Sequence, residues 1–351
     1  MRTKLLSLLF ILPLIGFSQV LDSDNFDALT IGNFGTDLTG MTPGQGGFLT
    51  FGNNGNPPST STNAADSNFQ VVASGNNGTQ GAQITSPDGD AGVRFLFKSI
   101  QTAWASRTSG NDIVELEFSF FTGSTTSAAP LRGLIFGDNA GAGATLAAIQ
   151  FDPATNELSG LATLNNGGTI GLFGFNLGAG NTDLILPANT WVTAGCAYDT
   201  ITGEIRWKTD FMNVNATFTV GANIIPGMAP LEANFLSFGT GGNTTATNYI
   251  IDDYTSRASD TDQLLSVDDV QLEASTISLY PNPADDVITL KTDISISNLS
   301  ITNNLGQVVM TKSANFSQTN DIDTSSLSPG IYIMSISSED RRTETRKFIK
   351  N

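Results

Sequence analysis

Short runs in which every second residue is apolar recur along the chain, and no long stretch has the spacing of a helix. In one of them, Val114, Leu116 and Phe118 fall on the same face. A period of two is typical of a β-strand that buries one of its faces. Runs of this kind lie at residues 93–100, 112–123, 131–138, 231–240 and 248–256.

Two segments combine a pair of such runs around a polar turn. Residues 146–164 turn at 153–156, and residues 191–210 turn at 200–203. This pattern is typical of β-hairpins. No sequence period of about 20–50 residues recurs, so neither a propeller nor a solenoid is predicted. We therefore expect residues 19–256 to form an all-β jelly roll of two packed sheets.

The last part of the chain, residues 276–351, has its own set of short strands. A hairpin pattern occupies residues 299–312, and alternating runs lie on either side of it at 286–291, 331–337 and 345–350. Short strands at this spacing predict a small β-sandwich of the immunoglobulin-like kind.

The N-terminus, residues 1–18, has the pattern of a secretory signal peptide. Arg2 and Lys4 precede an apolar stretch over residues 5–17, and Ser18 provides a small residue at the predicted cleavage site. The apolar stretch is too short to span a bilayer, and no other segment is long and apolar enough to do so. We expect an exported chain that does not span a membrane.

Residues 257–275 lack a periodic pattern and are rich in Asp and Ser. Such a composition is typical of a linker between domains. The predicted order is therefore a signal peptide at 1–18, a jelly roll at 19–256, this linker with the cleavage region, and a C-terminal domain at 276–351.

Charge and composition exclude several functional classes. The formal net charge is −17, and the excess of Asp and Glu lies in residues 19–273. Such an acidic surface repels phosphate backbones, so nucleic-acid binding is not expected. The chain has no histidine, which excludes His-based triads, His acid–base catalysis and His-ligated zinc. Its single cysteine, Cys196, lies in an apolar run and is expected to be a buried, inert thiol.

Five short motifs follow one another near the C-terminus. They are Tyr280-Pro281-Asn282-Pro283, Leu305-Gly306-Gln307, Asp323 through Leu327, Pro329-Gly330-Ile331-Tyr332 and Lys347-Phe348-Ile349-Lys350. In this order they resemble the type A C-terminal sorting domain of type IX secretion substrates. The resemblance implies two partners, the secretion translocon and a sortase-like peptidase that removes the domain. It also implies a product that is secreted or attached to the outer cell surface.

A second set of motifs lies in the middle region. They are NFDALTIG at 25–32, Trp191, Tyr198-Asp199, Thr202-Gly203, Trp207 and Ile251-Asp252-Asp253-Tyr254. Together they resemble concanavalin-type and laminin-G-like jelly rolls, a pattern that bacterial carbohydrate-binding modules share. The resemblance implies a glycan ligand. It also implies a structural calcium ion held by Asp27 near the first strand and Asp252 on the last, with Asp24 and Asp253 as alternates.

Two acidic side chains are candidates for catalysis. Glu115 and Glu117 are two residues apart on a predicted strand, so they share a face. They either provide an acid–base pair or form the solvated side of the strand. Jelly-roll glycosidases of the laminarinase type use the pattern E-x-D-x-x-E, whereas residues 112–117 contain D-x-x-E-x-E. No catalytic residue is therefore predicted.

Aromatic side chains are candidates for sugar contacts. Trp104 lies in a polar stretch close to Arg107, where an exposed ring would stack on a sugar. Trp191 and Trp207 lie in alternating runs and are expected in the core.

Three functional classes remain open: a binding or adhesion module for glycans or surfaces, a structural cell-surface protein, and a polysaccharide-acting enzyme. Exposed aromatic rings in a concave groove would favour the first class over the second. Two carboxyl groups about 5–10 Å apart in a cleft would favour the enzyme.

Overall fold

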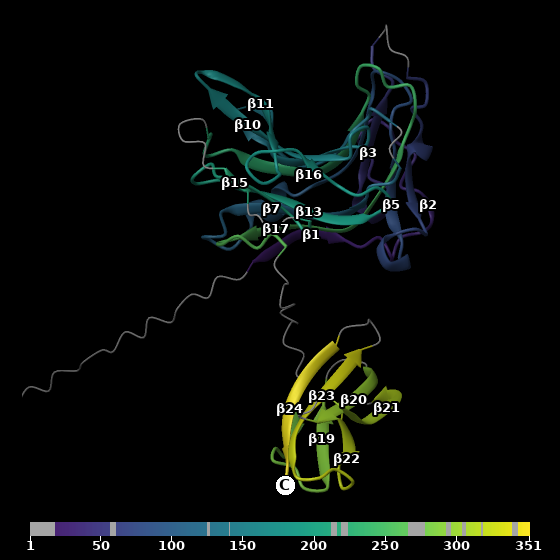
Figure 1. Cartoon of the computed structure of the whole chain (residues 1–351), viewed down its shortest axis with the longest axis vertical. Helices are drawn as coiled ribbons and strands as arrows, with labels where there is room; N and C mark the ends of the chain where they lie inside the picture. The colour runs from purple at the N-terminus through teal and green to yellow at the C-terminus, as the bar shows by residue number, and fades with distance from the viewer. Residues whose placement is uncertain are drawn as a thin grey trace, which may run out of the picture. The chain divides into compact units, whose positions relative to one another are not determined.

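The computed structural model describes residues 18–56, 61–124, 127–139, 141–211, 216–218, 224–265, 278–292, 296–303, 307–316, 319–338 and 343–351. The chain divides into two compact units, Met1–Ser266 and Val267–Asn351, and both consist almost entirely of antiparallel strands (Figure 1). None of the helices in the described residues is long and apolar enough to span a membrane. The predicted signal peptide lies outside the described residues, apart from Ser18.

Two sheets form the first unit. One sheet has the strand order β15-β14-β13-β7-β17-β5-β4-β2, and β1 also pairs with β17. Its strands are β1 (Gln19–Asp24), β2 (Gly32–Asn33), β4 (Phe69–Val72), β5 (Gly81–Thr85), β7 (Ile113–Phe121), β13 (Trp191–Asp199), β14 (Ile205–Thr209), β15 (Ala216–Phe218) and β17 (Asn248–Ser259).

The other sheet has the order β11-β10-β9-β8-β16-β6-β3, and β12 also pairs with β10. Its strands are β3 (Leu49–Asn53), β6 (Val93–Ser99), β8 (Leu131–Asn139), β9 (Ala142–Asp152), β10 (Glu157–Asn166), β11 (Thr169–Asn176), β12 (Leu184–Ile185) and β16 (Ala229–Phe238). This sheet is bent: β11 and β3 rise at its two ends, and β16 lies between them (Figure 1). Within the described residues, four short helices join the strands: η1 (Gln45–Gly47), η2 (Asp66–Asn68), η3 (Asn76–Gly78) and α1 (Gln101–Ala105).

The core fills the space between the two sheets. Phe118 of β7 meets Phe235 of β16 edge to face, with ring centroids 5.1 Å apart. Trp207 of β14 is buried and donates from Nε1 to the carbonyl oxygen of Ala148 at 2.8 Å. Cys196 is also buried, and this burial raises the pKa of its thiol, as expected for an inert cysteine. The jelly-roll prediction is confirmed, including the β9–β10 and β13–β14 hairpins.

The end of the first unit differs from the prediction. β17 runs to Ser259, and the chain stays packed on the first unit as far as Leu265. Leu264 is buried, and Lys208 Nζ lies 2.8 Å from Asp262 Oδ2. The linker prediction is therefore wrong for residues 257–265, because their contacts are irregular and leave no periodic pattern. Residues 266–275 lie outside the described residues.

The second unit is the small sandwich that the sequence predicts. One sheet contains β18 (Ser278–Tyr280), β19 (Val287–Lys291) and β22 (Thr319–Asp323), and the other contains β21 (Val308–Phe316), β20 (Ile296–Asn303), β23 (Gly330–Ser338) and β24 (Thr343–Lys350). A single apolar cluster lies between them, formed by residues such as Ile288, Ile301, Met334 and Phe348.

Candidate functional site

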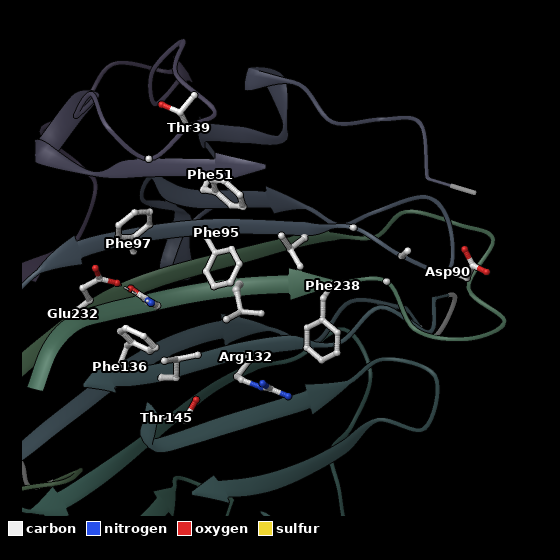
Figure 2. A pocket seen from close by; sticks show the side chains of 18 residues that line it. Thr39, Phe51, Asp90, Phe95, Phe97, Arg132, Phe136, Thr145, Glu232 and Phe238 are labelled. Carbon is white, nitrogen blue, oxygen red and sulfur yellow. Dashed lines mark hydrogen bonds between the residues drawn. The ribbon is translucent and has the colours of Figure 1, made fainter. Parts of the chain in front are cut away.

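The outer face of the bent sheet carries a groove with a volume of about 810 Å³. Strands β3, β6, β8 and β16 form its floor. Figure 2 shows the rings of Phe51, Phe95, Phe97, Phe136 and Phe238 among the side chains that line it. None of these five phenylalanines was singled out from the sequence.

Strand register explains why these side chains lie together. Leu236 of β16 pairs with Phe95 on one side and with Arg132 on the other, and Phe95 in turn pairs with Phe51. Residues paired across neighbouring strands point to the same face of a sheet. The four side chains therefore form one row across the floor of the groove.

Two further rows lie parallel to the first. Asn234 pairs with Phe97 and Leu134, and Glu232 pairs with Phe136. The polar side chains thus alternate with apolar ones across the floor. Asn234 Nδ2 donates to Glu232 Oε2 at 3.2 Å, which connects the two rows.

The floor is apolar although it faces outward. Leu134, Ala148, Leu161 and Leu236 form a cluster separate from the main core, with Phe95 and other partly buried rings packed against it. An outer sheet face is normally polar where it meets only water. Contiguous apolar surface of this kind is typical of a ligand-binding or interaction site.

A loop held by Asp37 forms one wall. The Asp37 carboxylate accepts hydrogen bonds from the backbone N–H groups of Thr39, Met41 and Thr42, at 2.9, 2.9 and 2.7 Å. The Thr39 hydroxyl also donates to Asp37 Oδ1 at 2.7 Å, and this bond, followed by the backbone bonds, holds the pKa of Asp37 well below its usual range. The loop places Gly40 so close to the ring of Phe97 that a Cβ atom would lie 3.2 Å from it.

A tight crossing of two loops lies at one end of the groove. The N–H of Gly239, just after β16, donates to the carbonyl oxygen of Gly92 at 3.0 Å. A Cβ atom at position 239 would lie 2.6 Å from the backbone nitrogen of Ala91, so the crossing requires glycine. The crossing fixes the loop that carries Asp90 at this end of the groove.

Arg132 is the cation of the groove. Its Nε and Nη2 donate to Oε1 of Gln150 at 3.2 and 2.6 Å, and its guanidinium carbon lies 4.8 Å from the ring centroid of Phe238. Burial lowers the pKa of Arg132 to about 10. The guanidinium is thus partly desolvated by the apolar surface around it.

The two carboxylates of the groove lie at opposite ends (Figure 2). Glu232 lies six residues before Phe238 on β16, and Asp90 lies beside the loop that follows Phe238. Six residues of strand span about 20 Å. Glycosidases hold their two carboxyl groups about 5–10 Å apart, so this pair does not have the spacing of a hydrolytic site.

Trp104 does not form a ligand platform. It belongs to the core and is only 8% exposed. Arg107 covers the ring with its guanidinium carbon 4.0 Å from the ring centroid, and Nη2 of Arg107 also pairs with Asp112 Oδ1 at 2.6 Å. The prediction of an exposed ring beside Arg107 is wrong, because a short helix, α1, turns Trp104 inward. Trp191 is partly exposed and packs on Phe121.

Asp27 and Asp252 converge on the turn at η3. Asp27 Oδ1 accepts from the backbone N–H of Gln80 at 2.9 Å. Asp252, which is buried, accepts from the N–H of Asn76 at 2.7 Å and from Oγ1 of Thr79 at 2.9 Å. These hydrogen bonds use part of the acceptor capacity of the two carboxylates, so a cation bound here would compete with them.

The alternates Asp24 and Asp253 line a separate small cavity of about 400 Å³. Burial, followed by the charge of Asp27, raises the pKa of Asp253, and burial raises that of Asp24. The described residues contain no group of three or more acidic or thiol side chains that could hold a metal ion. Calcium binding therefore stays a prediction.

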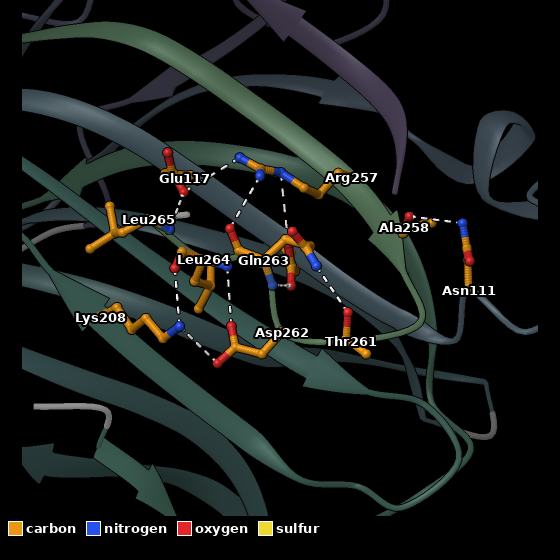
Figure 3. A network of polar contacts seen from close by, with 11 residues as sticks. Asn111, Glu117, Lys208, Arg257, Ala258, Thr261, Asp262, Gln263, Leu264 and Leu265 are labelled. Carbon is orange, nitrogen blue, oxygen red and sulfur yellow. Dashed lines mark hydrogen bonds and ion pairs between the residues drawn. The ribbon is translucent and has the colours of Figure 1, made fainter. Parts of the chain in front are cut away.

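Glu115 and Glu117 share a face of β7, but this face is largely covered: Glu115 is buried and the Glu117 side chain is only 18% exposed. Figure 3 shows Glu117 beside Arg257 of the neighbouring strand. Arg257 of the neighbouring strand pairs with both carboxylates, its Nε 3.7 Å from Glu115 Oε2 and its Nη2 3.4 Å from Glu117 Oε2. The segment after β17 lies over them, and Leu265 N–H donates to Glu117 Oε2 at 2.7 Å. Both carboxylates therefore bind Arg257 and the segment after β17, and they lie outside the groove.

The C-terminal motifs, distant in sequence, partly meet in space. Asn282 accepts from the N–H of Ile349 at 2.9 Å and donates to the carbonyl oxygen of Lys347 at 3.2 Å, so it holds the last strand. Ala284, next to Pro283, bridges to Lys350. Tyr280 remains half exposed at the end of β18, just before Pro281.

The remaining motif residues support turns. Tyr332 donates to the carbonyl oxygen of Ser328, next to Pro329 and Gly330, and stacks on Phe348 at 5.5 Å. Gln307 closes the β20–β21 hairpin through Asn303. Leu305 and Gly306 lie outside the described residues.

Comparison with known proteins assigns the second unit. Residues 278–351 match the family model of the secretion system C-terminal sorting domain. The match agrees with the resemblance of the C-terminal motifs to a sorting domain and is confined to this region of the chain. No curated protein sequence matches the chain.

Solved structures similar to the first unit include the laminarinase from Rhodothermus marinus, with 12% identity and a TM-score of 0.42, covering 70% of this chain and 99% of that one. A Bacteroides ovatus family 16 glucanase has 12% identity and a TM-score of 0.40, covering 68% and 100%. The CBM2 module of the Lactobacillus casei phage J-1 evolved Dit protein has 13% identity and a TM-score of 0.39, covering 70% and 98%.

Proposed function

We propose that the first unit is a binding module that holds a carbohydrate chain in the groove of the bent sheet. The carrying observation is the set of phenylalanine rings on an outward-facing floor, interleaved with Arg132, Asn234 and Glu232. A sugar ring has apolar C–H faces and polar edges. The rings would contact those faces, and the polar side chains would bind the hydroxyl groups.

Hydrolysis is the less supported alternative. Asp90 and Glu232 lie too far apart to act on one glycosidic bond, and Glu115 and Glu117 are covered by the end of the first unit. The absence of histidine also removes the commonest general base. A purely structural cell-surface role would not account for an exposed apolar groove, which is typical of a binding site.

The C-terminal region also bears on where the first unit would bind its ligand. We propose that the translocon recognises residues 278–351, that a sortase-like peptidase removes them, and that the first unit acts in the medium or on the outer cell surface. A groove-bearing module in that location would attach the cell or its secreted enzymes to polysaccharide.

The test is a glycan array probed with the full chain, followed by affinity measurements on the glycans that bind. Phe95→Ala and Phe97→Ala are expected to weaken binding about tenfold each, because each removes one stacking ring. Phe211→Ala is the matched control, since this phenylalanine is 43% exposed and lies outside the groove. Absence of glycan binding, or equal affinity in all variants, would overturn the proposal.

A further inference from the structure

Arg132 has donors that the protein does not use. A guanidinium offers two edges, each able to bind a carboxylate with two parallel hydrogen bonds. Gln150 occupies the edge formed by Nε and Nη2 through its single oxygen Oε1. The other edge, formed by Nη1 and Nη2, has no hydrogen-bond partner within the described residues.

The charge of Arg132 is also uncompensated. Arg107, Arg206 and Arg257 each pair with a carboxylate. Among the described residues, no carboxylate lies within 4.0 Å of Arg132. Its neighbours are the neutral amide of Gln150 and the ring of Phe238. A cation that is partly removed from water and left unpaired carries a cost that an incoming anion would offset.

We propose that the ligand carries a carboxylate, which binds the free edge of Arg132 while the neighbouring sugars lie along the phenylalanine floor. This inference rests on the proposed function of the groove. The carboxylate would belong to a uronic acid residue of the glycan chain, because uronic acids combine an apolar ring face with this charge.

The charges of the chain favour a glycan with few such residues. Glu232 pairs with Phe136, which lies four residues from Arg132 on β8, a spacing of about 13 Å. A second carboxylate near Glu232 would be repelled. The net charge of −17 adds a longer-range repulsion against a fully charged polyuronate. The predicted ligand therefore has isolated uronic acid residues among neutral sugars.

The test compares immobilised polysaccharides with sparse uronic acids before and after chemical reduction of their carboxyl groups. Glucuronoxylan, gum arabic and xanthan are the probes, and the full chain is the protein. We expect binding to at least one native polysaccharide that is about tenfold or more tighter than binding to its reduced form. Reduction replaces each carboxylate of the ligand with a neutral CH2OH group and leaves the protein unaltered, so this comparison does not depend on how a variant folds.

Variants of the chain supply the second arm. Arg132→Gln is expected to bind both forms of the polysaccharide equally, and Arg132→Lys to keep part of the preference, because lysine retains the charge but not the forked edge. Glu232→Gln is the matched control in the same groove and should keep the preference. A melting curve confirms that each variant is folded.

The outcomes separate the two proposals. The carboxylate proposal would be overturned if the unmodified chain bound native and reduced forms equally, or if the Arg132→Gln variant kept the preference. Either result would leave the proposal of a glycan-binding groove unaffected. Tight binding of neutral glycans alone would do the same. Absence of binding to every glycan on the array would overturn the proposed function, and this inference with it.

Discussion

The backbone N–H of Gln263 donates a 2.8 Å hydrogen bond to Oε1 of Glu115. This bond joins the chain leaving the first unit to a strand at the centre of the sheet. Glu115 is fully buried, and Arg257 lies beside it with Nε 3.7 Å from Oε2. A buried carboxylate is costly unless its partners are kept, so residues beyond β17 are part of the folded unit.

The same contact predicts how stability changes with pH. Burial raises the pKa of Glu115 to about 7, against 4.5 for a free side chain. The folded state therefore binds the proton more tightly than the unfolded state, and this contribution to stability falls as pH rises from about 4.5 to 7. Glu115→Gln should reduce the loss of stability between pH 5 and pH 8 by up to about 3 kcal/mol.

Urea unfolding at several pH values between 5 and 8 measures this effect. No histidine titrates in the chain, so little else changes charge in this window. Glu204→Gln, at an ion pair with Arg206, controls for the removal of one carboxylate. Parallel pH profiles for the Glu115→Gln variant and the unmodified chain would contradict the prediction.

The domain boundary gives a second prediction. A first unit that ends at residue 256 lacks Arg257 and the N–H groups of Gln263 and Leu265, and it leaves Glu115 buried without these partners. It should be about 3–5 kcal/mol less stable than a unit that ends at Leu265. Denaturant unfolding of both truncated chains provides the comparison. Equal stability would show that residues 257–265 contribute nothing to the fold.

Strand alternation was enough to predict most of the fold. The runs at residues 93–100, 112–123 and 131–138 became β6, β7 and β8 with shifts of only one or two residues. Alternation reports which side of a strand is apolar, and this is what decides how sheets pack. Alternation could not predict that residues 260–265 belong to the first unit. These residues are attached to it by single hydrogen bonds and by one buried side chain, Leu264.

The groove was harder to predict. Its floor combines residues of four strands, and their alignment depends on register between segments as distant as Phe51 and Leu236. One signal was present in the sequence. In β16 both Phe235 and Leu236 are apolar, so both faces of the strand are covered, which is unusual for an outer sheet. The prediction that Trp104 is exposed was wrong because it relied on the polar residues around it. These residues form a short helix, α1, which turns the Trp104 ring inward.

The wall of the groove gives a third prediction. Asp37→Ala removes the acceptor that shapes the loop carrying Thr39 and Gly40. Because Asp37 lies at the surface, the core should be little affected, but the wall beside Phe97 should lose its fixed shape. We expect glycan affinity to fall several-fold with little change in melting temperature. Unchanged affinity in the variant would show that this loop does not contribute to binding.

Export gives a fourth prediction. A fluorescent protein with a signal peptide and with residues 266–351 at its C-terminus should reach the medium or the cell surface of a host that has a working type IX translocon. Asn282→Ala should reduce export, because it removes both hydrogen bonds that hold the last strand. Val308→Ala, at a side chain that is 62% exposed, is the control. Retention of the unmodified fusion in the periplasm would contradict the proposed route.

The turn at η3 supports a fifth prediction. In Asp252, Oδ2 accepts from the N–H of Asn76 and Oγ1 of Thr79, and Oδ1 accepts from the N–H of Asp253. Asp252→Asn leaves only one acceptor oxygen for these three donors. The variant should lose about 1–3 kcal/mol of stability in the presence of chelator, since buried donors lose their acceptor. An unchanged melting temperature in chelator would contradict this role. The calcium prediction adds a separate effect that the same variant tests.

A calcium ion at Asp27 and Asp252 must displace the donors that these carboxylates hold in the folded chain. If it does, binding to the native state adds about 2.7 kcal/mol at a hundredfold excess over Kd, and the unmodified chain should melt several degrees higher in millimolar calcium than in chelator. Asp252→Asn should remove that difference. An equal melting temperature of the metal-free unmodified chain in both buffers would exclude the ion and leave Asp252 as a hydrogen-bond acceptor for the turn.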